Sequence, residues 1–290
     1  MEQTTALAYA KINLSLDILG TLPNGYHEVC MIMQSLSLHD TVVLTKEKTP
    51  GIVLTCSDAS LPTDASNLAY RAAAAFFEHF LPDGGVRIDL TKRIPCAAGL
   101  AGGSSDAAAV LRGMNTLFDI HASMEELAAI GVTLGADVPY CLFLGTALSE
   151  GIGERLTRLP DAPDCFCLLV KPEAGASTGL IYKNYDALEP TGVIRHPDTP
   201  ALLSALDRKD YSFLCEHLCN VLEPVTLQLV PEIAALLSEV SALGADGVRM
   251  SGSGPTVFGL FSDRKKAEKA AETLQTHGWK NVFLTEFFRP

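Results

Sequence analysis

The sequence predicts a two-domain α+β protein. Its 290 residues are 48% hydrophobic, which is enough apolar content to bury a substantial core in about two domains. Strand patterns dominate the first 60 residues, and helical patterns lie on either side of a glycine-rich loop. The hydrophobic pattern changes after Pro160 and Pro163, which interrupt regular secondary structure. We therefore expect an N-terminal domain over residues 1–160 and a C-terminal domain over residues 161–290.

The first domain combines strands and helices in the order set by hydrophobic periodicity. Alternating apolar residues predict strands near 4–19, 26–37, 41–46, 51–56 and 86–92. Apolar residues at helical spacing predict helices near 64–80, 104–118 and 123–134. Gly151 and Gly153 indicate a hairpin at the end of this domain.

The second domain begins with a buried strand at 165–170. Helices are predicted near 177–187, 211–222, 231–243 and 263–277, and further strands near 247–251, 256–261 and 281–287. This order resembles a split βαβ, ferredoxin-like unit. Residues 188–202 contain three prolines and are predicted to form a surface loop.

Charge and composition exclude several classes of partner. The 22 basic and 34 acidic residues give a net charge of −12, which disfavours binding to nucleic acid or to an anionic membrane. No apolar run approaches the ~20 residues of a membrane-spanning helix, and the first residues lack the features of a signal peptide. We expect a cytoplasmic protein, monomeric or homodimeric, that acts on small molecules.

The eight cysteines include no Cys-x-x-Cys pair. Cys215, His217 and Cys219 suggest a metal site, but no second cluster accompanies them. Free buried thiols are therefore the expected state of the cysteines.

A glycine-rich loop leads into a helix between Pro95 and Ala109. Glycines at 99, 102 and 103 allow positive φ and let a ligand approach the backbone. Ser104 and Ser105 supply hydroxyl groups at a helix start, where unpaired N–H groups and the helix dipole favour an anion. The loop is predicted to hold a phosphate group, and a plain connection is the alternative.

Two common nucleotide signatures are absent. The chain has no Gly-x4-Gly-Lys-Ser/Thr, and the three loop glycines lack the Gly-x-Gly-x-x-Gly spacing. A dinucleotide-dependent oxidoreductase is therefore disfavoured.

Three motifs in chain order resemble those of the GHMP kinases. They are the loop at 99–108, the strand Ala8–Leu16 that carries Lys11 and Asn13 on one face, and the strand-turn-strand segment Arg249–Gly259. The resemblance implies a two-domain GHMP kinase fold, with an N-terminal α/β nucleotide-binding domain and a C-terminal ferredoxin-like domain. It also implies transfer of phosphate from ATP, with Mg²⁺, to a small-molecule alcohol.

The resemblance assigns roles to individual residues. Lys11 and Asp137 would be catalytic, with Asp137 removing the proton of the attacking hydroxyl and Lys11 keeping that aspartate ionised. Ser105 would approach Mg²⁺ or the β-phosphate. The ATP-binding residues would be Pro95, Ala97, Ala98, Gly99, Leu100, Ala101, Gly102, Gly103, Ser104, Ser105 and Asn67. Local alternatives are a helix N-cap for Asp137 and Asn67, and a solvent-facing lysine for Lys11.

Further segments resemble a branch of this family that uses a cytidylyl substrate. They are Asn24–Glu28, Gly135–Tyr140 and Ala147–Glu154. In this branch Tyr26 and Tyr182 would stack on cytosine, His27 would bond to its edge, and Asn13 and Asp137 would also contact substrate. A turn aromatic beside a half-buried imidazole is the local alternative for Tyr26 and His27.

The rival functions are another GHMP kinase, acting on homoserine or phosphomevalonate, and a catalytically silent sugar sensor of the same fold. The presence of both Lys11 and Asp137 argues against the sensor.

Overall fold

The computed structural model describes residues 2–23, 25–175 and 177–290. They form two compact units that are discontinuous along the chain. Unit 1 is Met1–Ala10, Leu38–Cys96 and Ala101–Leu144, and unit 2 is Lys11–Ser37, Ala97–Leu100 and Gly145–Pro290. The mixture of helices and sheets confirms the α+β class. The linear division near residue 160 stays a prediction, because discontinuous units do not test it.

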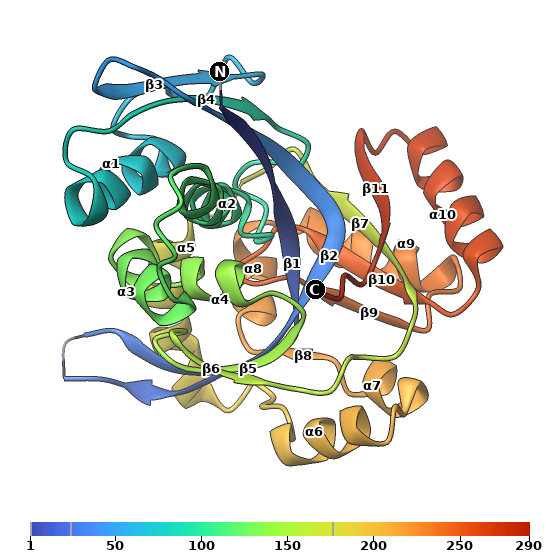
Figure 1. Ribbon diagram of the computed structural model, residues 1–290. Coiled ribbons are helices and arrows are strands. Elements are labelled where there is room, and N and C mark those ends of the chain that lie inside the picture. Colours follow the sequence, from blue (N-terminus) through green and yellow to red (C-terminus); the bar gives the residue numbers. More distant parts are fainter. Residues whose placement is uncertain (1, 24, 176) are drawn as a thin grey trace. The chain divides into compact units, whose positions relative to one another are not determined.

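Unit 1 packs helices together with part of a sheet. β3 (Gly51–Cys56) is parallel to β4 (Gly85–Thr91), and β4 is antiparallel to the end of β2 (His27–Lys46). β1 (Gln3–Thr21) begins in this unit. The helices contact one another (Figure 1) and are α1 (Leu68–Phe80), α2 (Gly102–Leu117), α3 (Met124–Leu134) and α4 (Val138–Phe143).

Local sequence explains these helices. Alanines and phenylalanines recur on one side of α1 and are buried. Ser123 and Glu126 form a capping box at the start of α3, which satisfies backbone N–H groups of its first turn. The strands expected at 26–37 and 41–46 are one continuous strand, β2. Its two halves pair with different neighbouring strands.

Unit 2 contains a four-stranded antiparallel sheet in the order β11-β7-β10-β9. Its strands are β7 (Phe166–Lys171), β9 (Gly247–Met250), β10 (Val257–Phe261) and β11 (Asn281–Glu286). Helices α9 (Glu232–Ala242) and α10 (Arg264–Thr276) pack against this sheet (Figure 1). The order and the two helices confirm the expected ferredoxin-like arrangement.

The rest of unit 2 includes the second half of β1 and the first half of β2, together with the elements that pair with them. β5 (Thr146–Gly151) pairs with β2 and forms a hairpin with β6 (Arg155–Arg158), and β8 (Cys219–Asn220) pairs in parallel with β1. The remaining helices are α5 (Thr178–Leu188), the 3-10 turn η1 (Glu189–Thr191), α6 (Thr199–Asp207), α7 (Tyr211–Glu216) and α8 (Glu223–Leu229).

Two sequence expectations are wrong in this region. The helix expected at 211–222 ends at Glu216, because residues 219–220 pair with β1 instead. The loop expected at 188–202 is helical from Thr199, where Asp198 caps α6 and Pro200 stands in its first turn. Proline is tolerated there because that N–H has no partner inside the helix.

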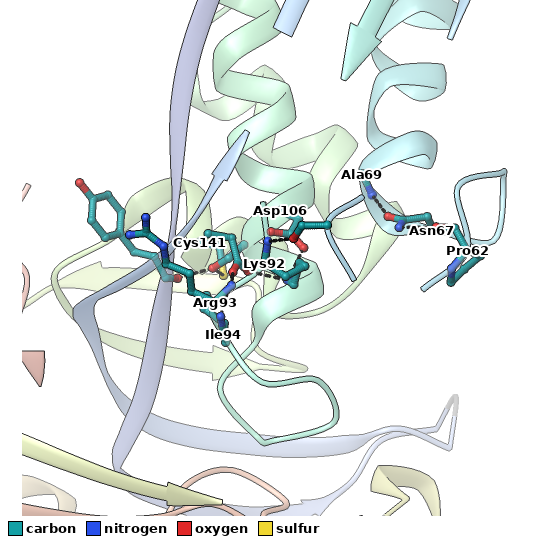
Figure 2. Close-up of polar contacts among 12 residues, drawn as sticks. Pro62, Asn67, Ala69, Lys92, Arg93, Ile94, Asp106 and Cys141 are labelled. Atoms are coloured by element: carbon teal, nitrogen blue, oxygen red, sulfur yellow. Dashed lines mark hydrogen bonds and ion pairs between the residues drawn. The ribbon is translucent and has the colours of Figure 1, made fainter. Parts of the chain in front are cut away.

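A buried ionic network in unit 1 joins strands β2 and β4 to helix α2 (Figure 2). Lys92, directly after β4, donates to Asp40 of β2 and, at 2.6 Å, to Oδ2 of Asp106 in α2. Oδ1 of Asp40 also accepts the backbone N–H groups of Arg93 and Ile94. The network therefore fixes the backbone on which the glycine-rich loop begins.

Burial and neighbouring charges shift the pKa values of Asp106 and Lys92 in this network. Burial raises the pKa of Asp106 to about 8, helped by the charge of Asp40 and opposed by Lys92. Burial alone would lower the pKa of Lys92, but the two carboxylates outweigh it and raise that pKa. The raised pKa makes Asp106 easier to protonate than an ordinary aspartate, which reduces the negative charge that Lys92 has to balance.

Asp40 should therefore contribute more to stability than Asp106. We expect Asp40→Asn to lower the free energy of unfolding by about 3 kcal/mol, as in other broken buried ion pairs. Asp106→Asn should cost less than ~1 kcal/mol at neutral pH, because the raised pKa of Asp106 already favours its neutral form. Urea denaturation of both variants measures the difference, and equal losses would contradict this charge assignment.

A comparison of the wild type with Asp106→Asn at different pH values gives a second test. The folded-state pKa of Asp106 lies above that of an unfolded aspartate, so the wild type loses stability as pH rises between the two values. Asp106→Asn has no such proton to lose. The free energy of unfolding of Asp106→Asn, relative to that of the wild type, should therefore rise by up to ~1.4 kcal/mol per pH unit between about pH 5 and pH 8. A constant difference across this range would mean that Asp106 is ionised throughout in the folded protein.

Candidate active site

Lys11 and Asn13 lie on the same side of β1 and contact each other. Lys11 is only 4% exposed, and its Nζ donates to Oδ1 of Asn13 at 2.8 Å. Nδ2 of Asn13 in turn donates to Sδ of Met31 at 3.3 Å. The shared face predicted from strand alternation is confirmed, and the alternative of a solvent-facing Lys11 is wrong.

Parts of the three motifs lie together within unit 2: Lys11 of the first strand, residues 97–100 of the loop and the C-terminal glycine turn. The N–H of Lys11 donates to the carbonyl of Leu100, and Oγ of Ser251 donates to the carbonyl of Gly99 at 3.0 Å. A Cβ at Gly99 would lie 2.2 Å from the carbonyl oxygen of Ser251, so this position accepts only glycine. A Cβ at Gly252 would lie 3.5 Å from Nζ of Lys11. The first strand, the loop and the C-terminal glycine turn therefore lie side by side.

Side chains that the sequence analysis missed hold the C-terminal glycine turn. Nδ2 of Asn220 donates to the carbonyls of Met250 and Gly252, both at 2.8 Å. Oε2 of Glu223 accepts the N–H of Met250 at 2.8 Å, and its Oε1 accepts from Arg249. Asn220 is the second residue of the two-residue strand β8, and Glu223 is the first residue of α8. Neither belongs to a motif or a periodic pattern, so only the folded chain reveals their role.

Positive φ alternates along the glycine-rich loop, at Ala97, Gly99 and Ala101. Such alternation turns successive N–H groups toward one side and is typical of anion-binding loops. The expected positive φ is confirmed at Gly99 and wrong at Gly102 and Gly103, which form the first turn of α2. The helix therefore starts two residues before the predicted start at Ser104. Ala101 caps it in a left-handed conformation without a side-chain hydrogen bond.

The first turn of α2 is accessible at Gly103. Gly103 is exposed, and a Cβ there would meet one atom, Cδ1 of Leu68 at 3.3 Å. N–H groups of the first helical turn have no carbonyl partner within the helix. The predicted contributions of Pro95 and of residues 97–105 to ATP binding stay predictions.

Ser105 is buried at the base of α2. Its hydroxyl donates to the carbonyl of Tyr9 and lies 3.3 Å from Sγ of Cys141, which Figure 2 labels. A hydroxyl oxygen suits Mg²⁺ chemically. Because this hydroxyl is already engaged with Tyr9, its contact with Mg²⁺ stays a prediction.

Asp137 stands at the N-cap position of α4 and is partly buried. Its backbone carbonyl accepts the N–H of Cys141, but its side chain accepts no capping hydrogen bond from this helix. The N-cap position that the local alternative predicts is therefore confirmed, without a capping hydrogen bond from the side chain. Its catalytic role stays a prediction.

The predicted base-binding residues gather between β2 and α5. The ring of His27 lies 5.0 Å from that of Tyr182, at 41°. Nε2 of His27 lies 2.6 Å from Oδ1 of Asp186, a residue that the sequence analysis missed. Tyr26 is 61% exposed. Asn24 lies outside the described residues.

Asn67 caps α1, as its local alternative predicts. Its Oδ1 accepts the N–H of Ala69 at 2.9 Å, and its Nδ2 donates to the carbonyl of Pro62 at 2.8 Å (Figure 2). A contact with adenine stays a prediction.

The cysteines differ in burial. Five are buried and two are half-buried, whereas Cys96 is exposed because it lies on the loop, so the expected burial is wrong there. Within residues 2–23, 25–175 and 177–290, no three His, Cys, Asp or Glu side chains are grouped to hold a metal ion. In the same described part of the chain, every helix is too short or too polar to span a bilayer.

Comparisons with known proteins agree with this arrangement. Residues 67–145 match the GHMP kinases N terminal domain, and residues 202–279 match the GHMP kinases C terminal family. A 4-diphosphocytidyl-2-C-methyl-D-erythritol kinase of Lachnoclostridium phytofermentans is 47% identical, over 99% of this chain and 98% of that protein. Its counterpart in Acetivibrio thermocellus is 46% identical over 99% of both chains.

Solved structures show the same relationship. A crystal structure of 4-(cytidine 5'-diphospho)-2C-methyl-D-erythritol kinase has a TM-score of 0.83 and 35% identity, covering 99% of this chain and 100% of that one. The mevalonate kinase of L. major, at 15% identity and a TM-score of 0.77 over 99% of this chain and 97% of that one, shares the fold. This chain belongs to the GHMP kinase family, among its 4-diphosphocytidyl-2-C-methyl-D-erythritol kinases.

Proposed function

We propose that this protein transfers the γ-phosphoryl group of ATP to the 2-hydroxyl of 4-diphosphocytidyl-2-C-methyl-D-erythritol, a step of non-mevalonate isoprenoid precursor biosynthesis. The observation that carries the proposal is the identity of 46–47% with kinases of that name over nearly the whole chain. The fold alone does not select this substrate, since a homoserine kinase and a mevalonate kinase share it at 20% identity or less.

Phosphoryl transfer depends mainly on positioning and on neutralising charge. The alternating backbone of the loop and the first turn of α2 would bind the phosphates of ATP, and Lys11 would hold a positive charge beside the glycine turn at 252. Mg²⁺ bound with ATP would neutralise phosphate charge. Asp137 would accept the proton of the attacking hydroxyl.

Cytosine would be held away from the reacting hydroxyl. Tyr26 and Tyr182 would stack on its two faces and His27 would bond to its polar edge, with Asn13 near the rest of the substrate. The contact between His27 and Tyr182 supports this assignment because both residues come from segments far apart in the sequence. A cytoplasmic location and a monomeric or homodimeric state stay predictions.

One experiment tests the proposal directly. The protein is incubated with Mg·ATP and 4-diphosphocytidyl-2-C-methyl-D-erythritol, and a new phosphomonoester is followed by phosphorus NMR. We also compare a uridine analogue of the substrate. Equal kcat/KM for the two bases would favour another kinase of this fold, such as one acting on homoserine or phosphomevalonate.

Asp137→Asn should lower kcat by at least ~100-fold and leave ATP affinity within a few-fold, because an amide cannot take the proton. Lys11→Ala should behave similarly. The two losses should be less than additive if both residues serve one proton transfer. Asp119→Asn, at a side chain that is 86% exposed, is the matched control in steady-state assays. Near-wild-type turnover by Asp137→Asn would remove Asp137 from the mechanism.

Gly103→Val should abolish ATP binding and retain the fold, because its methyl groups would fill the open space over the first turn of α2. Gly179→Val places the same change in the first turn of α5, where a Cβ meets nothing within 4 Å, and should bind ATP normally. Circular dichroism and nucleotide titration measure both. Unchanged ATP affinity in Gly103→Val would mean that the loop is only a connection.

Tyr26→Ala and Tyr182→Ala should each raise KM for the cytidylyl substrate about 10- to 100-fold, since stacking of a base on an aromatic ring contributes ~1–3 kcal/mol. The KM for ATP should change less, which serves as an internal control in the same assays. Equal effects on both KM values would indicate a general loss of structure instead of a lost base contact.

A further inference from the structure

His27 is held by three residues of one helix. Tyr182, Tyr185 and Asp186 follow one another at helical spacing on α5, so all three side chains lie on its face toward His27. The ring of Tyr182 is tilted on that of His27 at 5.0 Å, and the ring of Tyr185 meets it edge-on at 6.2 Å. Asp186 bonds to its Nε2 at 2.6 Å. These contacts leave the imidazole little freedom to turn.

The bond to Asp186 also decides where the proton of the ring lies. An ionised carboxylate accepts hydrogen bonds and cannot donate them. A 2.6 Å contact with Oδ1 of Asp186 therefore requires the hydrogen to be on Nε2. In the neutral imidazole the other nitrogen, Nδ1, then has no hydrogen and is an acceptor.

The two pyrimidine bases differ at the group that such an acceptor would meet. Cytosine presents an N4 amino group, which donates, whereas the 4-oxo pyrimidines present a carbonyl oxygen, which accepts. An Nδ1 acceptor forms a hydrogen bond with the amino group and is repelled by the carbonyl oxygen. The opposite tautomer, with hydrogen on Nδ1, would reverse this preference.

The unequal exposure of His27 and Asp186 favours selectivity. The side chain of His27 is 13% exposed, so water cannot readily replace a missing partner on its ring. Asp186 is 54% exposed, so its own charge stays hydrated while one oxygen holds Nε2. A mismatch at the imidazole is therefore costly, while the residue that fixes the tautomer stays on the surface.

We propose that Asp186 is a specificity-determining positioning residue, which fixes the Nε2–H tautomer of His27 so that Nδ1 selects an aminopyrimidine over an oxopyrimidine. The proposal deepens the function given above and rests on it for the identity of the base. Asp186 acts through His27 and does not itself touch the base.

The test compares Asp186→Asn with the wild type for the cytidine substrate and its uridine analogue. An amide can donate to the ring or accept from it, so the tautomer is no longer fixed. We expect the ratio of kcat/KM for cytidine over uridine to fall about 10-fold or more, mainly through KM. Neither kcat with the cytidine substrate nor KM for ATP should change more than a few-fold. An unchanged ratio would overturn the proposal.

Glu189→Gln is the matched control. It removes the same charge at the end of the same helix. In the described part of the chain His27 bonds to Asp186 and not to Glu189. The control should keep the wild-type ratio. A similar loss of selectivity in both variants would mean that net charge acts in place of the tautomer, and would also overturn the proposal.

A second readout does not depend on turnover. Nitrogen-15 NMR of the imidazole, assigned with His27→Gln, should show hydrogen on Nε2 in the wild type and a mixture of tautomers in Asp186→Asn. Hydrogen on Nδ1 in the wild type would refute the inference even if the enzyme prefers cytidine. A wild type that does not phosphorylate the cytidylyl substrate would instead overturn the proposed function, and the choice of base with it, while NMR still decides the tautomer.

Discussion

Two buried carboxylates and one lysine share the space beneath the glycine-rich loop, and the position of the loop depends on how their charges are satisfied. Removing charged groups from water is costly unless each finds partners. Asp40 meets this requirement by accepting from Lys92 and from the backbone N–H groups of Arg93 and Ile94. Those N–H groups belong to the two residues directly before the loop. The electrostatic requirement of one aspartate therefore fixes the backbone that leads into the candidate phosphate site.

The C-terminal glycine turn is also held by buried polar side chains. Glycine gives no side chain to pack, so a turn rich in glycine needs anchors from elsewhere. Asn220 and Glu223 supply them by binding backbone groups of β9 and of the turn that follows it. The turn can then lie close to Gly99 and Lys11 without losing its shape. In both places polar side chains hold a backbone segment of the candidate active site.

The proposed base site would add a different kind of control. Its aromatic rings would supply contact area, but stacking alone is tolerant of which base is bound. Selection between two bases of the same shape depends on the placement of hydrogens, and a carboxylate beside a histidine fixes that placement. Under the proposal for Asp186, the tyrosines provide affinity for the base. The imidazole and its partner on α5 provide the selectivity between bases.

The sequence by itself determined what depends on near neighbours along the chain. Strand alternation put Lys11 and Asn13 on one face, and the position of Asn67 made it a candidate cap for α1. The sequence did not single out Gly99 among the three loop glycines that allow positive φ. Tertiary structure decided the pairing of β8 that ends the helix expected at 211–222, the ion pair of Lys92 with Asp40, 52 residues away, and the bond of His27 to Asp186, 159 residues away. Periodicity and capping reflect local backbone conformation, whereas contacts between distant segments form only when buried surfaces pack and leave no repeating pattern in the chain.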